Sequence, residues 1–171
     1  ALRPDGRLAC WGGIMASVAP TDSGYIDVSV AQNRGCAIRG DGTLQCWQPA
    51  GVASLGAIPA GRFLSVATGA THACALRSDG QAVCLGSNAQ GQTSAPTGVR
   101  FVALTVGHQY SCGLREDGGI SCWGLNDTNQ LAAPAGRYTA LSAGRAHTCA
   151  RTVDGNTRCW RSRAARTVGD C

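Results

Sequence analysis

Residues 72–86 read HACALRSDGQAVCLG, in which Cys74 and Cys84 flank nine residues with Asp79-Gly80 at their centre. Apolar and small residues stand on both sides of this pair, as in two short strands joined by a tight turn. A glycine at the third loop position suits a type I turn that closes through a left-handed residue. The stretch therefore predicts a β-hairpin in which the two cysteines lie opposite each other.

Counting outward from the turn places Leu76 opposite Ala82 and Arg77 opposite Gln81. Two cysteines at a non-hydrogen-bonded antiparallel pair have their β-carbons near disulfide distance. Each bridge would close a short loop and contribute about 2–3 kcal/mol to stability. Four hairpins are predicted to carry such an intra-repeat disulfide: Cys36/Cys46, Cys74/Cys84, Cys112/Cys122 and Cys149/Cys159.

The hairpin belongs to a longer repeat, because Asp-Gly pairs begin at residues 5, 41, 79, 117 and 154. A period of 36 to 38 residues is typical of a propeller, a solenoid or another repeat array. The units are rich in glycine and lack a helical stripe of apolar residues, so strands are predicted, for example at 101–106, 111–115 and 119–123. We therefore expect one all-β domain over 1–171, with repeats at approximately 1–25, 26–62, 63–99, 100–136 and 137–171.

Two repeated segments, 143–149 and 122–126, carry a family resemblance. They resemble the repeat of the RCC1-like propeller superfamily, and the resemblance covers essentially the whole chain. That superfamily includes a chromatin-bound exchange factor, a secreted β-lactamase-inhibitor propeller and the ectodomains of crinkly-type plant receptor kinases; the cysteine-bearing form is similar to the extracellular members. The resemblance implies a β-propeller, here of about five short blades, and no single activity.

The ten cysteines predict the compartment. Persistent disulfides belong to oxidising environments, so the protein is expected to be secreted or extracellular, and a nuclear, nucleic-acid-binding role is disfavoured. The close Cys and His clusters typical of zinc sites are missing from the sequence, and no metal or cofactor is expected. The sequence has no apolar run of 18 residues, so membrane insertion is not expected.

The two ends of the chain leave three interpretations. Cys10 belongs to a half-unit whose first cysteine would precede Ala1, and the chain ends on Cys171. Family propellers usually have seven blades, whereas five units are present here. Cys10 and Cys171 would close a five-bladed ring, or the chain is a fragment of a longer propeller, or Cys171 links neighbouring molecules. Self-closure is favoured because an open ring would expose two sheet edges.

The net charge of +5 comes from fifteen arginines and no lysine. Arg3, Arg39, Arg77 and Arg115 each stand two residues before the turn aspartate of their unit, and Thr152 takes that place in the last unit. In a propeller they would form a ring on one surface, a candidate site for an anion or a protein partner. The alternative is that each arginine pairs weakly with its own turn aspartate.

The turn aspartates are expected to stabilise their own turns through Asx-type hydrogen bonds. One carboxylate per unit, held far from the next, cannot supply the six or more oxygens of a calcium site. The aspartates are Asp5, Asp41, Asp79, Asp117 and Asp154.

Histidines and tryptophans also recur at fixed places in the repeat. His72 and His147 stand two residues before the first cysteine, where Tyr110 replaces them in the intervening unit, and a structural role is expected. The tryptophans that follow the second cysteine are expected to pack between blades rather than to form a sugar-binding face. They are Trp11, Trp47, Trp123 and Trp160.

No nucleophile elbow, phosphate-binding loop or paired-carboxylate arrangement is present in the sequence, so no catalytic residue is predicted. Asn126-Asp127-Thr128 fits an N-glycosylation acceptor in a surface loop. The sequence predicts an extracellular binding or scaffolding module for a protein partner, with two narrower forms: inhibition of a secreted hydrolase, and self-association as a structural subunit. The alternative from another class is a lectin with one shallow glycan site per blade.

Overall fold

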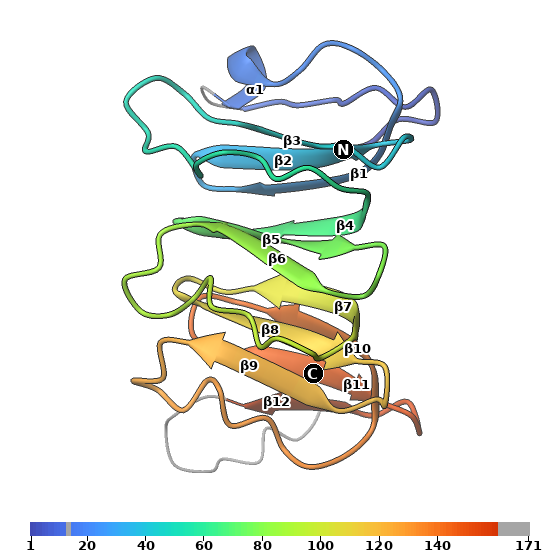
Figure 1. Ribbon diagram of the computed structural model, residues 1–171, viewed down its shortest axis with the longest axis vertical. Coiled ribbons are helices and arrows are strands. Elements are labelled where there is room, and N and C mark those ends of the chain that lie inside the picture. The colour runs from blue at the N-terminus through green and yellow to red at the C-terminus, as the bar shows by residue number, and fades with distance from the viewer. Residues whose placement is uncertain (13–14, 161–171) are drawn as a thin grey trace.

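The computed structural model describes residues 1–12 and 15–160. Four three-stranded antiparallel sheets are stacked along the longest axis of the molecule, with β1–β3 at one end and β10–β12 at the other (Figure 1). Within each sheet the strands follow chain order. The predicted all-β propeller architecture is confirmed, and each sheet is one blade.

Every sheet has a first, a middle and a third strand. The first strands are β1 (Tyr25–Ala31), β4 (Phe63–Thr68), β7 (Phe101–Val106) and β10 (Tyr138–Ala143). The middle strands are β2 (Arg34–Arg39), β5 (His72–Arg77), β8 (Tyr110–Arg115) and β11 (Thr148–Thr152). The third strands are β3 (Leu44–Trp47), β6 (Ala82–Gly86), β9 (Ile120–Gly124) and β12 (Thr157–Trp160). A short helix, α1 (Met15–Val18), precedes the first sheet.

The hairpin between the middle and third strands has the predicted register. In the second sheet, Leu76 pairs with Ala82. Gly80 closes the turn with φ of +85°, which an L side chain rarely adopts. All four predicted intra-repeat disulfides are confirmed, each with its Cα atoms 4.0 Å apart: Cys36–Cys46, Cys74–Cys84, Cys112–Cys122 and Cys149–Cys159.

The first strand of every sheet contains a β-bulge directly after its opening aromatic residue. The register with the middle strand shifts there, so one residue is left without a partner. A bulge bends its strand and re-aims the unpaired side chain. The unpaired residue of the fourth sheet is Thr139. The other three unpaired residues are apolar and more than half exposed: Ile26 (54%), Leu64 (56%) and Val102 (54%).

The core lies between successive sheets. Leu76 of the second sheet packs with Phe101 and Trp123 of the third, and Leu114 of the third packs with Tyr138 and Trp160 of the fourth. Adjacent blades are thus held by an apolar face on one and an aromatic face on the next.

The packing role predicted for the tryptophans is confirmed at three positions. Trp47, Trp123 and Trp160 are only 8%, 7% and 8% exposed. The prediction is wrong for Trp11, which is 76% exposed. Tryptophans of this repeat pack toward the preceding unit, and Trp11 belongs to the first hairpin, which has no preceding sheet among the described residues.

Residues 1–12 form a partial unit. Leu2 and Leu8 form an isolated bridge, and the carbonyl of Gly6 accepts a hydrogen bond of 3.0 Å from the N–H of Tyr25. The described residues therefore hold four complete blades and this hairpin, compared with the expected count of about five. Cys10 forms no disulfide with another described residue, and Cys171 lies outside them, so the predicted Cys10–Cys171 closure falls outside the described part of the chain.

Hydrogen bonds fix each hairpin turn to the next blade. The N–H groups of Phe63, Phe101 and Tyr138 donate to the carbonyls of the preceding turn glycines, each at 2.8 Å. The glycines are Gly42, Gly80 and Gly118. Side chains also connect first strands, since Asp27 accepts from the N–H of Val66 at 2.8 Å. The turns of neighbouring blades are thus held in a defined row.

The fourth sheet departs from the other three on its outer face. Arg151 pairs with Thr157 there, and both are exposed. The equivalent pair in the third sheet is Leu114 and Ile120, which pack against the fourth sheet. The fourth sheet therefore lacks the apolar pair with which its predecessors contact the next blade.

The four bridges differ in burial although their positions in the repeat are the same. Cys46 and Cys122, on third strands, are half-buried and pack into the apolar clusters that join their sheets to the next. Cys84 has the same place in the second sheet. Cys159 is exposed, because no further sheet among the described residues covers the fourth one. The repeat thus predicted the pairing of the sulfurs but not the solvent exposure of the last bridge.

Candidate protein-binding surface

The hairpin turns between middle and third strands line up at one end of the sheets, which we call the turn face. The Oδ1 atoms of Asp41, Asp79 and Asp117 accept hydrogen bonds of 2.9, 3.0 and 2.8 Å from the N–H two residues later. Asp5 makes the same bond at 3.0 Å, whereas Asp154 accepts from the side chain of Asn156. The Asx-turn prediction is confirmed at the first four of these turns. Among the described residues, no three His, Cys, Asp or Glu side chains are grouped so as to hold a metal ion.

Two of the four predicted arginines are paired with their own turn. Arg77 Nε donates to Asp79 at 2.8 Å, and Arg115 Nε donates to Asp117 at 3.0 Å. The Arg77 guanidinium and the N–H of Gln81 lower the pKa of Asp79 to about 2. Both arginines stay more than a third exposed, although Nη2 of Arg77 is also engaged by Asp79 at 2.5 Å.

Arg39 and Arg3 have other surroundings. Arg39 pairs with Asp22, from the segment before β1, and its guanidinium carbon lies 4.8 Å from the ring centroid of Tyr25. The Tyr25 hydroxyl donates to Asp22 at 2.7 Å, and burial with this hydrogen bond raises the pKa of Tyr25 to about 12. Arg3 is exposed in the first hairpin and forms no ion pair with another described residue. The predicted arginine set is therefore not four equivalent groups.

A second row of arginines was missed by the sequence analysis. Arg62, Arg100 and Arg137 directly precede the first strands of the second, third and fourth sheets. A β-carbon added at Gly42 would lie 3.0 Å from Cβ of Arg62, so the glycine lets this arginine cross the preceding turn. Gly80 and Gly118 have the same relation to the other two arginines. The sequence contains a signal for this second row: a glycine, an arginine and an aromatic residue follow one another at 61–63 and again at 136–138.

Two of the three arginines in the second row carry charge that the turns do not neutralise. Arg100 pairs with Glu116 at 3.3 Å, with both side chains about 60% exposed. Among the described residues, Arg62 and Arg137 pair with no carboxylate; Arg62 Nε donates to the carbonyl of Asp41 at 3.1 Å. These two guanidinium groups keep free donors for a carboxylate of a partner.

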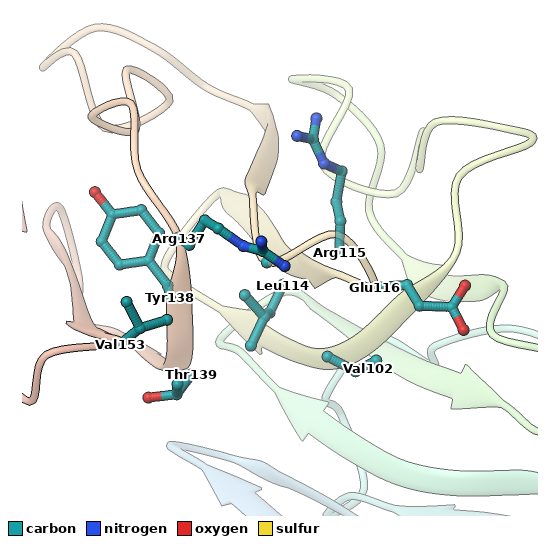
Figure 2. A pocket seen from close by; sticks show the side chains of 9 residues that line it. Val102, Leu114, Arg115, Glu116, Arg137, Tyr138, Thr139 and Val153 are labelled. Carbon is teal, nitrogen blue, oxygen red and sulfur yellow. The ribbon is translucent and has the colours of Figure 1, made fainter.

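A groove of about 460 Å³ lies on the turn face between the third and fourth sheets (Figure 2). Val102 and Leu114 supply apolar surface from the third sheet, and Val153, 67% exposed, supplies it from the fourth. Figure 2 shows Arg137 reaching from the fourth sheet toward Leu114, whereas the side chain of Arg115 points away from Leu114 and Val102. The groove thus combines the exposed side chains of Val102 and Val153 with the guanidinium group of Arg137, while Leu114 is buried in its wall and Arg115 stands at its edge.

The repeat places the same residue types at the other two blade junctions. Leu64, Arg77 and Arg100 stand at the second junction where Val102, Arg115 and Arg137 stand at the third. The first junction has Ile26, Arg39 and Arg62. We call the three junctions together the junction surface: one aliphatic bulge residue and two arginines at each blade boundary.

The histidine position lies inside the molecule and away from the turn face. His72 is fully buried, with Nε2 2.9 Å from the hydroxyl of Ser111, and burial lowers its pKa to about 4. Tyr110 donates from its hydroxyl to the carbonyl of His147 at 2.5 Å, and the side chain of His147 is exposed. The two histidines do not converge, in agreement with the structural role expected for them.

Asn126 is exposed in the loop between β9 and β10, where its Oδ1 accepts from the N–H of Leu131 at 3.1 Å. The loop is a surface loop as predicted, and glycosylation stays a prediction. Sequence reasoning missed two buried glutamines that organise such loops, Gln92 and Gln130. Their backbone carbonyls accept from the indole N–H of Trp123 and Trp160, each at 3.0 Å. The signal was an asparagine followed four residues later by a glutamine, at 88–92 and 126–130.

Comparison with known protein families decides the type of repeat. The family model described as the Regulator of chromosome condensation (RCC1) repeat matches residues 63–92, which contain the second sheet. This unit of the repeat is of the RCC1 type. The resemblance noted in the sequence is therefore confirmed, and the four hairpin disulfides fit the cysteine-containing form.

Solved structures share this RCC1-type fold. The ectodomain of the Physcomitrella patens receptor kinase CR4 is similar with a TM-score of 0.82 at 24% identity, over 94% of this chain and 49% of that chain. The ectodomain of the Arabidopsis thaliana receptor kinase ACR4 gives 0.76 at 24% identity, over 93% and 58%. Yeast RCC1 (Prp20), solved bound to Kap60, gives 0.68 at 17% identity, over 83% and 45%.

The chain thus spans about half the length of the solved structures that it matches. At these identities the likeness shows the fold alone. A search of curated proteins finds no match. No helix in the described part of the chain is long and apolar enough to cross a membrane.

Proposed function

We propose that this RCC1-type chain is an extracellular protein-binding module and that the turn face is its binding side. The observation that carries the proposal is the junction surface, where an exposed aliphatic bulge residue and two arginines recur at three successive blade boundaries. Aliphatic groups beside arginines are a composition that protein interfaces favour, because the first exclude water and the second bind carboxylates with defined geometry.

The hairpin disulfides support this proposal physically. Cys36, Cys74 and Cys112 are fully buried and bridge directly across their hairpins, so the turns that carry the surface are held before a partner arrives. Preorganisation of this kind raises affinity because less conformational entropy is lost on binding. The bridges also favour an extracellular location, as do the ectodomain relatives.

Protein binding is supported as well by proteins of the same fold. Yeast RCC1 (Prp20) was solved with Kap60, and Prp20p was characterised for binding to Gsp1p and histones. Kap60, Gsp1p and histones are partners of Prp20 and are not assigned to this chain. Three narrower statements remain predictions for this chain: that it has no catalytic activity, that it inhibits a hydrolase, and that it self-associates. The lectin alternative loses the tryptophan face on which a sugar would stack, since three of the four tryptophans are buried.

The test is a selection of binders from displayed random peptides on the immobilised protein with its disulfides intact. The recovered binders are then measured on the double variant Arg115→Gln/Arg137→Gln and on the matched control Arg145→Gln, an exposed arginine in the loop between β10 and β11. We expect most binders to lose affinity on the double variant and to keep it on the control. Recovery of no binder, or of binders indifferent to both changes, would contradict the proposal.

A further inference from the structure

The geometry points to one class of partner for the junction surface, and this inference rests on the proposed function. We propose that the surface binds an extended acidic segment with an aliphatic side chain at every third residue. The argument combines the spacing of the blades, the exposed bulge residues and the two rows of arginines.

The bulge residues set the spacing. Ile26, Leu64 and Val102 occupy one equivalent place in three successive sheets, directly after the aromatic residue that opens each first strand. The first strands of neighbouring sheets contact one another. Face-to-face sheets lie about 10 Å apart. A chain extended as polyproline II rises about 3.1 Å per residue with three residues per turn, so every third side chain points the same way and recurs about every 9 Å, close to the spacing of one blade. A polyproline II segment that crosses the blades therefore presents one side chain to each junction at every third position.

The bulge residues are suited to receive those side chains. Each is apolar and more than half exposed although it belongs to a strand. At the third junction Val102 lines the groove with Leu114 and Val153, so a bound aliphatic side chain would have apolar neighbours on both walls. Thr139 replaces the aliphatic residue in the fourth sheet, and the row of anchors therefore has three members.

The arginines determine the charge of the partner. Two residues of the segment remain between successive anchors, and both arginine rows flank the junctions on the turn face. Arg62 and Arg137 pair with no carboxylate of the described residues, while Arg77, Arg100 and Arg115 are held only by exposed ion pairs. Exposed pairs are weak, so these guanidinium groups can exchange to a carboxylate of the ligand at little cost. Asp or Glu at the intervening positions matches this surface.

The probe is a synthetic peptide of about 13 residues with Leu at every third position and Asp, Glu or Ser elsewhere, measured by fluorescence anisotropy on the disulfide-intact protein. Two peptides serve as controls: one of the same composition with its leucines clustered, and one with Lys in place of the acidic residues. We expect binding of the first peptide, at least about tenfold weaker binding of both controls, and a fall in affinity with added salt.

Matched protein variants locate the site. Val102→Ser and Arg137→Gln are each expected to weaken binding about tenfold. Val30→Ser and Arg145→Gln are the controls: Val30 is 53% exposed, nearly as much as Val102 at 54%, and lies at the other end of its strand. Neither control is expected to change the affinity by more than about twofold.

Three outcomes would overturn the inference. The first is equal binding of the clustered-leucine peptide, which would indicate general attraction of anions, an acidic glycan included. The second is tighter binding of a helical peptide with leucine at every seventh position. The third is failure of the peptide to bind or, if it binds, loss of affinity on the control variants alone. In each case the proposed function survives if displayed peptides of another pattern are recovered and their binding depends on Arg115 and Arg137. Failure of this inference can therefore be distinguished from failure of the proposed function.

Discussion

Protonation of the buried His72 is expected to destabilise the fold in mild acid. The imidazole is fully buried between the second and third sheets, with Nε2 2.9 Å from the hydroxyl of Ser111. Burial first, and the nearby charge of Arg34 in addition, lower its pKa from 6.5 to about 4. The unfolded chain therefore binds more protons than the folded chain between these values. Stability that is complete above pH 6.5 is lost as the pH falls toward 4.

The size of the effect follows from the two pKa values. With 6.5 in the unfolded chain and about 4 in the folded chain, the histidine alone removes roughly 2 kcal/mol of unfolding free energy at pH 5 relative to neutral pH. His72→Gln deletes this titration and keeps an amide that can bond to Ser111. The variant is expected to be somewhat less stable than the wild type at neutral pH and to lose less stability in acid.

The assay is urea unfolding with the disulfides intact, at about pH 7.5 and about pH 5. The drop in unfolding free energy between the two conditions should be roughly 2 kcal/mol larger for the wild type than for His72→Gln. His147→Gln is the matched control, because His147 occupies the equivalent place in the fourth sheet and is exposed. Equal drops for the wild type and His72→Gln would refute the reasoning that burial sets this titration.

Three further changes probe the packing of the blades. Gly113→Val is expected to cost about 1–3 kcal/mol, because a β-carbon there would lie 2.3 Å from the ring of Phe101; thermal unfolding measures it, and an unchanged midpoint would show that the ring moves aside without strain. Cys74→Ala/Cys84→Ala removes a bridge with a sequence separation of 10 and should lower the unfolding free energy by about 2–3 kcal/mol in urea, while a loss below about 1 kcal/mol would contradict the loop-closure argument. Trp160→Phe leaves a buried loop carbonyl without its indole donor and should cost about 1 kcal/mol or more in the same assay, whereas no loss would mean that water replaces the bond.

The hairpins could be predicted from the sequence because their constraints are local. Cys74, Cys84 and the Asp79-Gly80 turn fix a register within eleven residues, and the structure has that register. Local bonding also explains why the Asx turns were predicted correctly. The bulge after Phe101 could not be predicted, because it arises where the first strand pairs with the middle strand at the end away from their connecting loop 107–109, outside the local constraints of the disulfide hairpin.

The candidate surface was only partly predictable for the same reason. The sequence analysis selected Arg39, Arg77 and Arg115 by their distance from a turn, but the partner of Arg39 is Asp22, which comes from the segment before the sheet. Arg137 joins the groove only because the fourth sheet packs on the third, and stacking of sheets leaves no mark on local spacing. Residue spacing within one repeat predicted the structure of that repeat, whereas the contacts between repeats could be seen only in the three-dimensional structure.

The placement of the disulfides has a consequence for proteolysis. Every bridge of the described residues joins two strands of one hairpin, and none joins one blade to another. A protease that cuts inside a hairpin turn leaves both fragments covalently attached until a reductant is added. A cut in a linker such as 87–100 would leave the flanking blades held by noncovalent contacts alone. Gel electrophoresis of partial digests, with and without reductant, would therefore reveal which loops of the folded protein are accessible.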